Sequence, residues 1–143
     1  MATNSRIVKA PPGKVWGVLE DGWLYPLWVV GASRMREVDD DWPAVGSRLH
    51  HSVGSWPVLI DDTTESLEVV PDSLVRVRAR GWPGGEAEVL ITLEPHPQGT
   101  RVVIEEDAVR GPGVLVPRPV RSPLIGWRNV ETLRRLALLA ERR

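Results

Sequence analysis

The chain has 143 residues, a formal net charge of −1 and a hydrophobic fraction of 42%, which suits one domain, residues 1–143, with a core of its own. The near-zero charge gives no support for a nucleic-acid partner, and no apolar run approaches the ~18 residues that cross a bilayer, so no integral membrane association is expected. Because the sequence lacks cysteine and has no apolar signal-peptide core at its N-terminus, we expect a cytoplasmic protein without disulfides or thiolate chemistry.

The first part of the chain is predicted to form one strand and two short helices. Residues 6–10 read as a short strand, which Pro11 and Pro12 end. These prolines suit the first turn of a helix, and the apolar spacing predicts an amphipathic helix over 12–21. A second helical or turn segment follows over 22–30, where an internal proline limits the helix length.

From residue 32 onward the apolar period changes from near 3.6 to 2, which indicates strands. Proline, glycine and acidic turns separate six such segments: 33–39, 47–56, 59–70, 74–81, 87–94 and 100–109. Short connections between them imply antiparallel pairing. The sheet has to bury one face, so we expect a long helix to cover it.

The long helix is predicted over 124–143, after a proline-rich crossover. One stripe at spacings of three and four is expected to face the sheet, and it consists of Gly126, Val130, Leu133, Ala137 and Ala140. Small residues in this stripe allow either close packing or a space between helix and sheet. Behind several antiparallel strands we interpret them as one wall of a pocket. Asn129, at the edge of the stripe, is then a polar group that reaches toward a ligand, and Arg128 is expected on the opposite side.

Short motifs follow one another in a definite order along the chain: Ala10-Pro11-Pro12 with Val15-Trp16, then Trp28 and Gly31, Gly46-Ser47-Arg48-Leu49, Gly99-Thr100-Arg101-Val102, and the C-terminal helix. Their order and spacing resemble the START-like, or SRPBCC, superfamily, which includes the polyketide cyclase/dehydrase and lipid-transport group. The resemblance covers essentially the whole chain.

The resemblance implies an α+β helix-grip fold. In this fold a curved seven-stranded antiparallel sheet surrounds a long C-terminal helix, with two short helices between the first and second strands. Members bind or transport hydrophobic or amphipathic small molecules in a cavity between sheet and helix, or act on them as cyclases or aromatases. The superfamily has no single catalytic motif, so the resemblance implies a cavity and leaves the reaction and the oligomeric state open. No cofactor is expected.

Strand alternation predicts which polar side chains enter such a cavity. The apolar residues of 47–56 and 100–109 place His51 and Glu106 on the face that turns to the helix. In 59–70 the phase set by the apolar C-terminal half places three polar residues on that face: Asp61, Thr63 and Glu65. A bulge or a one-residue shift of register would invert any of these assignments.

The predicted lining supports two kinds of chemistry. His51 suits a ligand hydrogen bond or an acid/base role, because its ordinary pKa lies near neutrality; the alternative is a half-buried histidine held by a carboxylate. Glu65 and Glu106 are either carboxyls with a raised pKa in an apolar cavity or rim carboxylates paired with arginine. Neither the three histidines nor the paired aspartates have the ligand spacing of a zinc or calcium site, so no metal is expected.

Seven tryptophans, one tyrosine and no phenylalanine supply the large aromatic side chains, and indoles often line clefts. Trp16 is predicted to pack in the core under the first helix. Val130 and Leu133 are predicted to contact the ligand from the long helix. Three further tryptophans are predicted to line the mouth or interior of the cavity, or alternatively to pack in the core: Trp28, Trp56 and Trp127.

The leading hypothesis is a protein that binds an apolar or amphipathic small molecule, lipid or polyketide-like, between its sheet and its terminal helix. The second is a cyclase or dehydratase in which His51 works with Glu106 or Asp61 as an acid/base pair; it requires these groups to share the cavity. The third is an interaction domain with a vestigial cavity, which a large exposed apolar patch and a closed cavity would favour.

Overall fold

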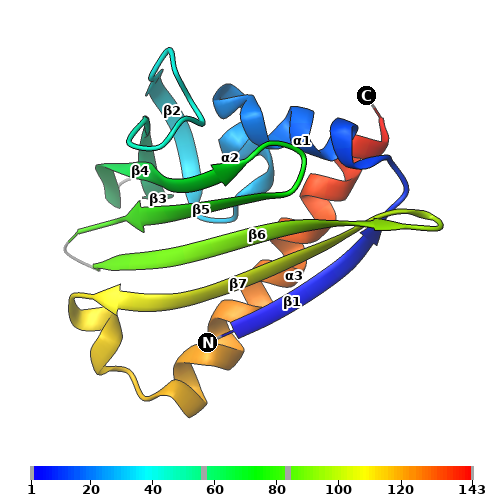
Figure 1. Cartoon of the computed structure of the whole chain (residues 1–143). Helices are drawn as coiled ribbons and strands as arrows, with labels where there is room; N and C mark the ends of the chain where they lie inside the picture. The colour runs from blue at the N-terminus through cyan, green and yellow to red at the C-terminus, as the bar shows by residue number, and fades with distance from the viewer. Residues whose placement is uncertain (1, 56–57, 83–84, 143) are drawn as a thin grey trace.

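The computed structural model describes residues 2–55, 58–82 and 85–142. Within them, seven strands form one antiparallel sheet in the order β1-β7-β6-β5-β4-β3-β2, and the long helix α3 lies across one face of it (Figure 1). This arrangement confirms the predicted helix-grip fold. The elements in chain order are β1 Ala2–Val8, α1 Pro12–Glu20, the 3₁₀ turn η1 Gly22–Leu24, α2 Tyr25–Trp28, β2 Ala32–Val38, β3 Arg48–Ser55, β4 Val58–Val70, β5 Leu74–Arg80, β6 Glu86–His96, β7 Gly99–Arg110, the 3₁₀ turn η2 Pro112–Leu115 and α3 Arg118–Glu141.

Two elements begin earlier than their apolar patterns indicate. β1 starts at Ala2, before the predicted 6–10, because its polar residues pair along β7, with Ala2 opposite Glu106. α3 starts at Arg118, before the predicted 124: Pro119 lies in its first turn, where backbone N–H groups have no partner anyway, and the helix continues through Pro123. Strand pairing therefore sets the start of β1, and the position of the prolines within the helix allows the early start of α3; hydrophobicity sets neither.

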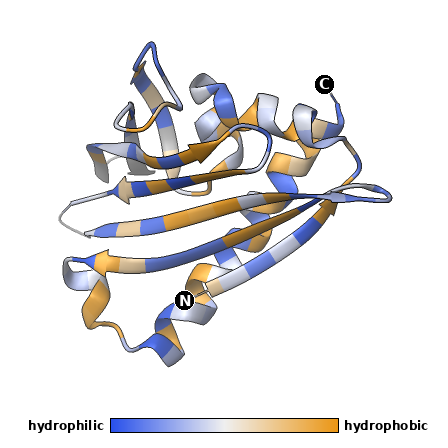
Figure 2. Cartoon of the chain, viewed as in Figure 1, coloured by the Kyte–Doolittle hydropathy of each residue, from blue (hydrophilic) through white to orange (hydrophobic). Residues whose placement is uncertain are grey.

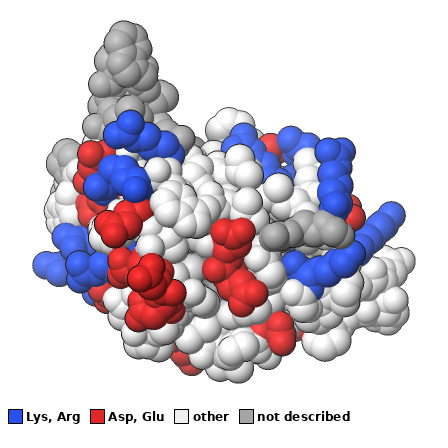
Figure 3. Space-filling view, turned by 90° about the horizontal axis from the view of Figure 1, so that it is seen from above, with Lys and Arg blue, Asp and Glu red and all other residues white. Residues whose placement is uncertain are grey.

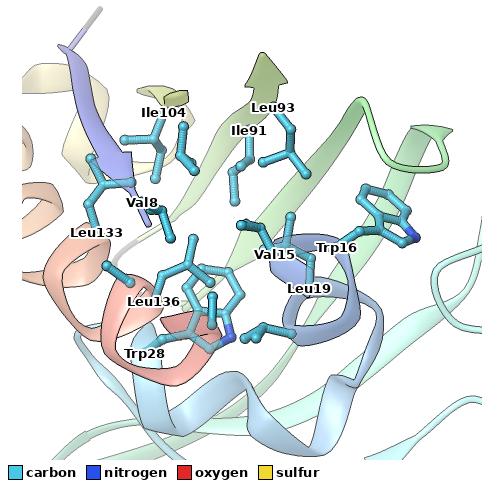
Figure 4. Packing of buried hydrophobic residues seen from close by; sticks show 14 of the residues in the cluster. Val8, Val15, Trp16, Leu19, Trp28, Ile91, Leu93, Ile104, Leu133 and Leu136 are labelled. Carbon is cyan, nitrogen blue, oxygen red and sulfur yellow. The ribbon is translucent and has the colours of Figure 1, made fainter. Parts of the chain in front are cut away.

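The core lies at the end of the sheet where α1 and the C-terminal half of α3 meet β1, β6 and β7. Figure 4 shows these side chains, and Figure 2 shows the hydrophobic stretch along β6, from which some of them come. Trp16 is 5% exposed, which confirms its predicted place in the core. Ala137 and Ala140 are 1% and 0% exposed and belong to this packed cluster. The small residues of the helix therefore allow close packing here, and they do not form the wall of a pocket as predicted.

A bulge in β4 changes which side chains face α3. Ser66 pairs with Val77 and Val69 pairs with Val75, so the four residues 66–69 of β4 lie opposite the three residues 75–77 of β5. Before the bulge the even-numbered Thr64 lies on the inner face of the sheet, opposite Ala79. After the bulge the odd-numbered Val69 lies on that face. A phase read from one side of the bulge is therefore wrong on the other side.

The surface carries charges of both signs. Figure 3 shows acidic and basic side chains grouped on the same face of the molecule, with uncharged residues between them. None of the helices in the described part of the chain is long and apolar enough to cross a bilayer.

Candidate functional site

The inner face of the sheet and the N-terminal half of α3 enclose a cavity in two adjoining parts. The outer part has a volume of about 380 Å³ and the inner part about 90 Å³. Both parts are lined by Tyr25, Val29, Ala79, Glu106 and Arg128. The outer volume falls within the roughly 300–1,000 Å³ of small-molecule sites.

Small side chains on three neighbouring strands leave the space for the outer part. Ala79, Ala87 and Ala108 line it from β5, β6 and β7, and Ala79 and Ala108 both pair with Ala87 across the sheet. Farther along the same strands the inner face carries valine and isoleucine, which fill the space and line the smaller inner part. The cavity therefore originates in the alanines of the sheet.

A polar relay lies on one wall of the outer part. His51 Nε2 is 2.7 Å from Thr64 Oγ1, and the Tyr25 hydroxyl is 3.3 Å from the same oxygen. The rings of Tyr25 and His51 stack with centroids 5.5 Å apart. The register explains the contact, because Thr64 pairs with Leu49 and His51 with Asp62, which puts Thr64 and His51 on one face as diagonal neighbours.

Burial sets the protonation of this relay. His51 is 2% exposed, and desolvation lowers its pKa to about 4, with Arg36 and His50 acting in the same direction and Asp62 against it. Burial also raises the pKa of Tyr25. Both side chains are therefore neutral at neutral pH. Nδ1 of His51 is buried without a hydrogen-bond partner among the described residues, so the imidazole keeps one free nitrogen.

Glu106 and Arg128 form an ion pair where the two parts of the cavity meet. The side chain of Glu106 is 8% exposed and that of Arg128 40%, so the guanidinium connects a buried carboxylate to solvent. The predicted inward position of Glu106 on β7 is confirmed. The prediction for Arg128, on the opposite side of the helix, is wrong.

The mouth of the outer part is rich in arginine. Arg80 lies 3.7 Å from Glu86, and Arg121 binds Asp107 at 2.8 Å. Arg110 also lines the outer part and makes no ion pair within the described residues. Arg110 is thus a cation at the mouth that has no ion pair among the described residues, although Glu86 lies opposite it on β6.

Three polar residues predicted to face the cavity point the other way. Asp61, Thr63 and Glu65 are paired with Ser52, His50 and Arg48, on the outer face of the sheet. Asp61 accepts a hydrogen bond from Ser52 at 2.6 Å, and Glu65 binds Arg48 at 3.0 Å. The prediction used the phase of Leu67 and Val69, and the bulge of β4 inverts it. The pairing of His51 with Asp61 as acid and base is excluded by this placement.

The residues predicted on α3 divide between cavity, core and surface. Asn129 is 2% exposed and lines the inner part, whereas Leu133 belongs to the packed core. Trp127 is 80% exposed and Val130 55%, so neither lines the cavity. The buried face of the helix also includes the polar Thr132, which the prediction did not name.

Of the tryptophans predicted at the cavity, Trp28 lies there. Trp28 is 5% exposed and lines the inner part of the cavity while also packing in the core. Its ring meets that of Tyr25 edge to face at 5.6 Å. Trp56 lies outside the described residues.

Sequence reasoning missed Tyr25, Thr64 and Arg128. Tyr25 is the only tyrosine of the chain, and an isolated aromatic hydroxyl in a short helix is a signal that could have found it. Thr64 was not predicted because the bulge changes the phase of β4.

His50 and His51 lie on opposite faces of β3, and the described residues contain no group of three His, Asp or Glu side chains that could hold a metal ion.

A curved antiparallel sheet that closes on a long helix around a cavity defines the helix-grip class of proteins. The chain belongs to the family described as polyketide cyclase / dehydrase and lipid transport, whose model matches residues 2–141. No curated protein matches the chain.

Solved structures share this fold over the full length of the chain. Protein MLL2253 from Mesorhizobium loti is 26% identical, with a TM-score of 0.68 over 99% of this chain and 96% of that one. Protein CV1439 from Chromobacterium violaceum is 22% identical, with a TM-score of 0.70 over 97% and 96%. The di-domain ARO/CYC StfQ from the steffimycin biosynthetic pathway is 11% identical, with a TM-score of 0.75 over 98% of this chain and 50% of that one.

Proposed function

We propose that the protein binds an amphipathic small molecule, lipid or polyketide-like, in the cavity between the sheet and α3. The observation that carries the proposal is an outer space of about 380 Å³ that adjoins an inner part lined largely by apolar side chains. Membership of a family described as polyketide cyclase / dehydrase and lipid transport supports it. A ligand that enters from the outer part would bury its apolar body against β5, β6 and β7.

The polar end of the ligand would remain near the mouth. Arg110 lines the outer part without an ion pair among the described residues, so it favours a ligand with an anionic group. Arg128 is half exposed but already paired with Glu106. An anion at the mouth gains attraction from Arg110 without breaking an existing pair.

The test combines native mass spectrometry of the purified protein, to detect a molecule that co-purifies, with titration of the anionic fluorophore 1-anilinonaphthalene-8-sulfonate. We expect a 1:1 complex whose affinity falls about threefold in Arg110→Gln and falls with added salt, because an exposed charge contributes roughly 0.2–1 kcal/mol. Arg118→Gln is the matched control, since Arg118 is exposed nearby but does not line the cavity. Absence of any saturable binding contradicts the proposal.

A cyclase or dehydratase is the alternative, and one observation favours it. His51, with a free Nδ1, and Glu106 both line the outer part, as an acid/base pair requires. Against it, a general base works best with a pKa near the operating pH, and the pKa of His51 is lowered to about 4. The lowered pKa leaves a good hydrogen-bonding group and a weak base, which makes binding the better conclusion.

The alternative is tested by proton exchange in a bound diketone. If His51 acts as a base, the protein in D₂O speeds deuterium incorporation at the central carbon of 1-phenyl-1,3-butanedione, and His51→Gln abolishes the acceleration. If wild type and variant give the same slow exchange while both bind the diketone, the cavity binds and does not catalyse this proton transfer.

A further inference from the structure

Two buried N–H groups on side chains that line the inner part of the cavity have no acceptor among the described residues. Nε1 of Trp28 and Nδ2 of Asn129 are both solvent-inaccessible and make no hydrogen bond within the described residues. Trp28 is 5% exposed and Asn129 2%. Both side chains line the inner part, from α2 and from α3, which approach each other closely. Figure 4 shows the indole of Trp28 among the buried side chains of the core.

The chemistry of these groups specifies what they require. An indole nitrogen is a donor only, so Trp28 can be satisfied by an acceptor and by nothing else. A carboxamide can present its nitrogen or its oxygen, so Asn129 can adapt to the same partner. The other side chains of the inner part are mostly apolar, and Thr132 Oγ1 already accepts a hydrogen bond from the Val30 N–H at 3.3 Å.

Leaving such a donor unpaired is costly. A buried polar group without a partner costs about 1–3 kcal/mol. Water can accept from these groups while no ligand is present, since a space of about 90 Å³ admits water molecules. A ligand that displaces this water must either supply an acceptor oxygen or leave both donors without a hydrogen bond. An alkyl end offers no acceptor, so it would leave both N–H groups without a hydrogen bond.

We infer that the end of the ligand that enters the inner part carries a hydrogen-bond acceptor oxygen, such as a ketone carbonyl, which Trp28 Nε1 and Asn129 Nδ2 bind. This inference rests on the proposed function and narrows it: the cavity selects an oxygenated apolar molecule over a hydrocarbon or an alkyl chain of the same shape. Trp28 and Asn129 determine that specificity: they line the inner part alone, whereas Glu106 and Arg128 line both parts.

The experiment compares 2-acetylnaphthalene with 2-ethylnaphthalene, which differ by a carbonyl in place of a methylene, by isothermal titration calorimetry. On burial of apolar surface alone the hydrocarbon would bind more tightly. We expect instead that wild type prefers the ketone about tenfold, the effect of roughly one net hydrogen bond. The preference should be lost in Asn129→Leu and in Trp28→Phe. Trp127→Phe, the same change at a side chain that is 80% exposed, should keep it.

A second readout does not depend on any variant being as stable as wild type. In ¹⁵N-labelled wild-type protein the indole N–H resonance of Trp28 should move downfield when the ketone binds and should not do so with the hydrocarbon. If both probes bind equally and the resonance moves with neither, the inference is overturned and the proposed function stands. If neither probe binds while 1-anilinonaphthalene-8-sulfonate does, the inference is overturned and the proposed function stands; if none of the three binds, both are overturned.

Discussion

His51 is a residue whose buried position makes the stability of the protein depend on pH. Its pKa is lowered from 6.5 to about 4, chiefly by burial. Above pH 6.5 the folded and unfolded chains both hold it neutral, whereas between 6.5 and 4 only the unfolded chain takes up the proton. Stability from His51 is therefore complete above pH 6.5 and is lost as the pH falls toward 4, by up to roughly 3 kcal/mol.

The prediction is checked by urea unfolding of wild type and His51→Gln at several pH values. Carboxylates titrate equally in both proteins, so the difference between their unfolding free energies isolates His51. Between pH 7 and pH 4.5 we expect the unfolding free energy of wild type to fall more than that of His51→Gln. A constant difference, or a pKa near 6.5 for the His51 ring in an NMR titration, contradicts a desolvated imidazole.

The Glu106–Arg128 pair allows a second prediction at this scale. Arg128→Met leaves the carboxylate of Glu106, 8% exposed, without its cation. Because the Arg128 side chain is 40% exposed, we expect a loss of about 1–2 kcal/mol, less than for a fully buried pair. Adding Glu106→Gln should recover part of the loss, and urea unfolding of the double-mutant cycle measures the coupling. Additive losses would show that the two side chains do not interact.

The hairpin between β5 and β6 depends on one glycine. Gly85 has φ of +123°, and a Cβ placed on it would come 2.1 Å from the carbonyl oxygen of Arg110. Backbone blocks the added methyl group, so no side chain can move to make room. Arg110 and Gly85 both line the mouth of the cavity, so this close approach also fixes the position of the mouth.

We therefore expect Gly85→Ala to destabilise the protein by about 2–3 kcal/mol, through the strained φ and the clash. Gly17→Ala is the control, because Gly17 lies inside α1 with nothing within 4 Å of the added carbon. That change should stabilise by about 0.5–1 kcal/mol. Thermal unfolding measures the stability of both variants. Equal changes in stability would contradict the special role of Gly85.

The bulge of β4 shows why strand positions were predicted well and strand faces only partly. Periodicity identified the strands from β2 onward, since alternation needs only local sequence, whereas β1 begins at Ala2 and not at the predicted residue 6. The face of His51 and Glu106 followed from apolar neighbours on the same strand. Asp61, Thr63 and Glu65 were placed on the wrong face because a bulge is fixed by pairing with β5, which one strand read alone does not reveal. On α3 the stripe led to Asn129 but not to Thr132, a polar residue whose burial is explained by the cavity that it lines.

At the scale of the whole molecule, the packing is divided between two regions. One end of the sheet is filled by the core around α1 and the C-terminal half of α3. The other end has alanines on three adjacent strands and the cavity above them. Exposed apolar side chains, among them Leu124 at 58%, also line or border the mouth. Because the cavity is open, the exposed apolar surface does not by itself favour an interaction domain with a vestigial pocket.

The most direct test of a ligand-binding cavity is to fill it. Ala79 lines both parts, so Ala79→Phe places a ring where the ligand would lie. We expect its affinity for 1-anilinonaphthalene-8-sulfonate to fall at least tenfold, with cooperative unfolding retained. Thr63→Phe, which adds a ring on the outer face of the sheet, should bind like wild type. If Ala79→Phe binds the fluorophore as tightly as wild type, the ligand does not enter this cavity.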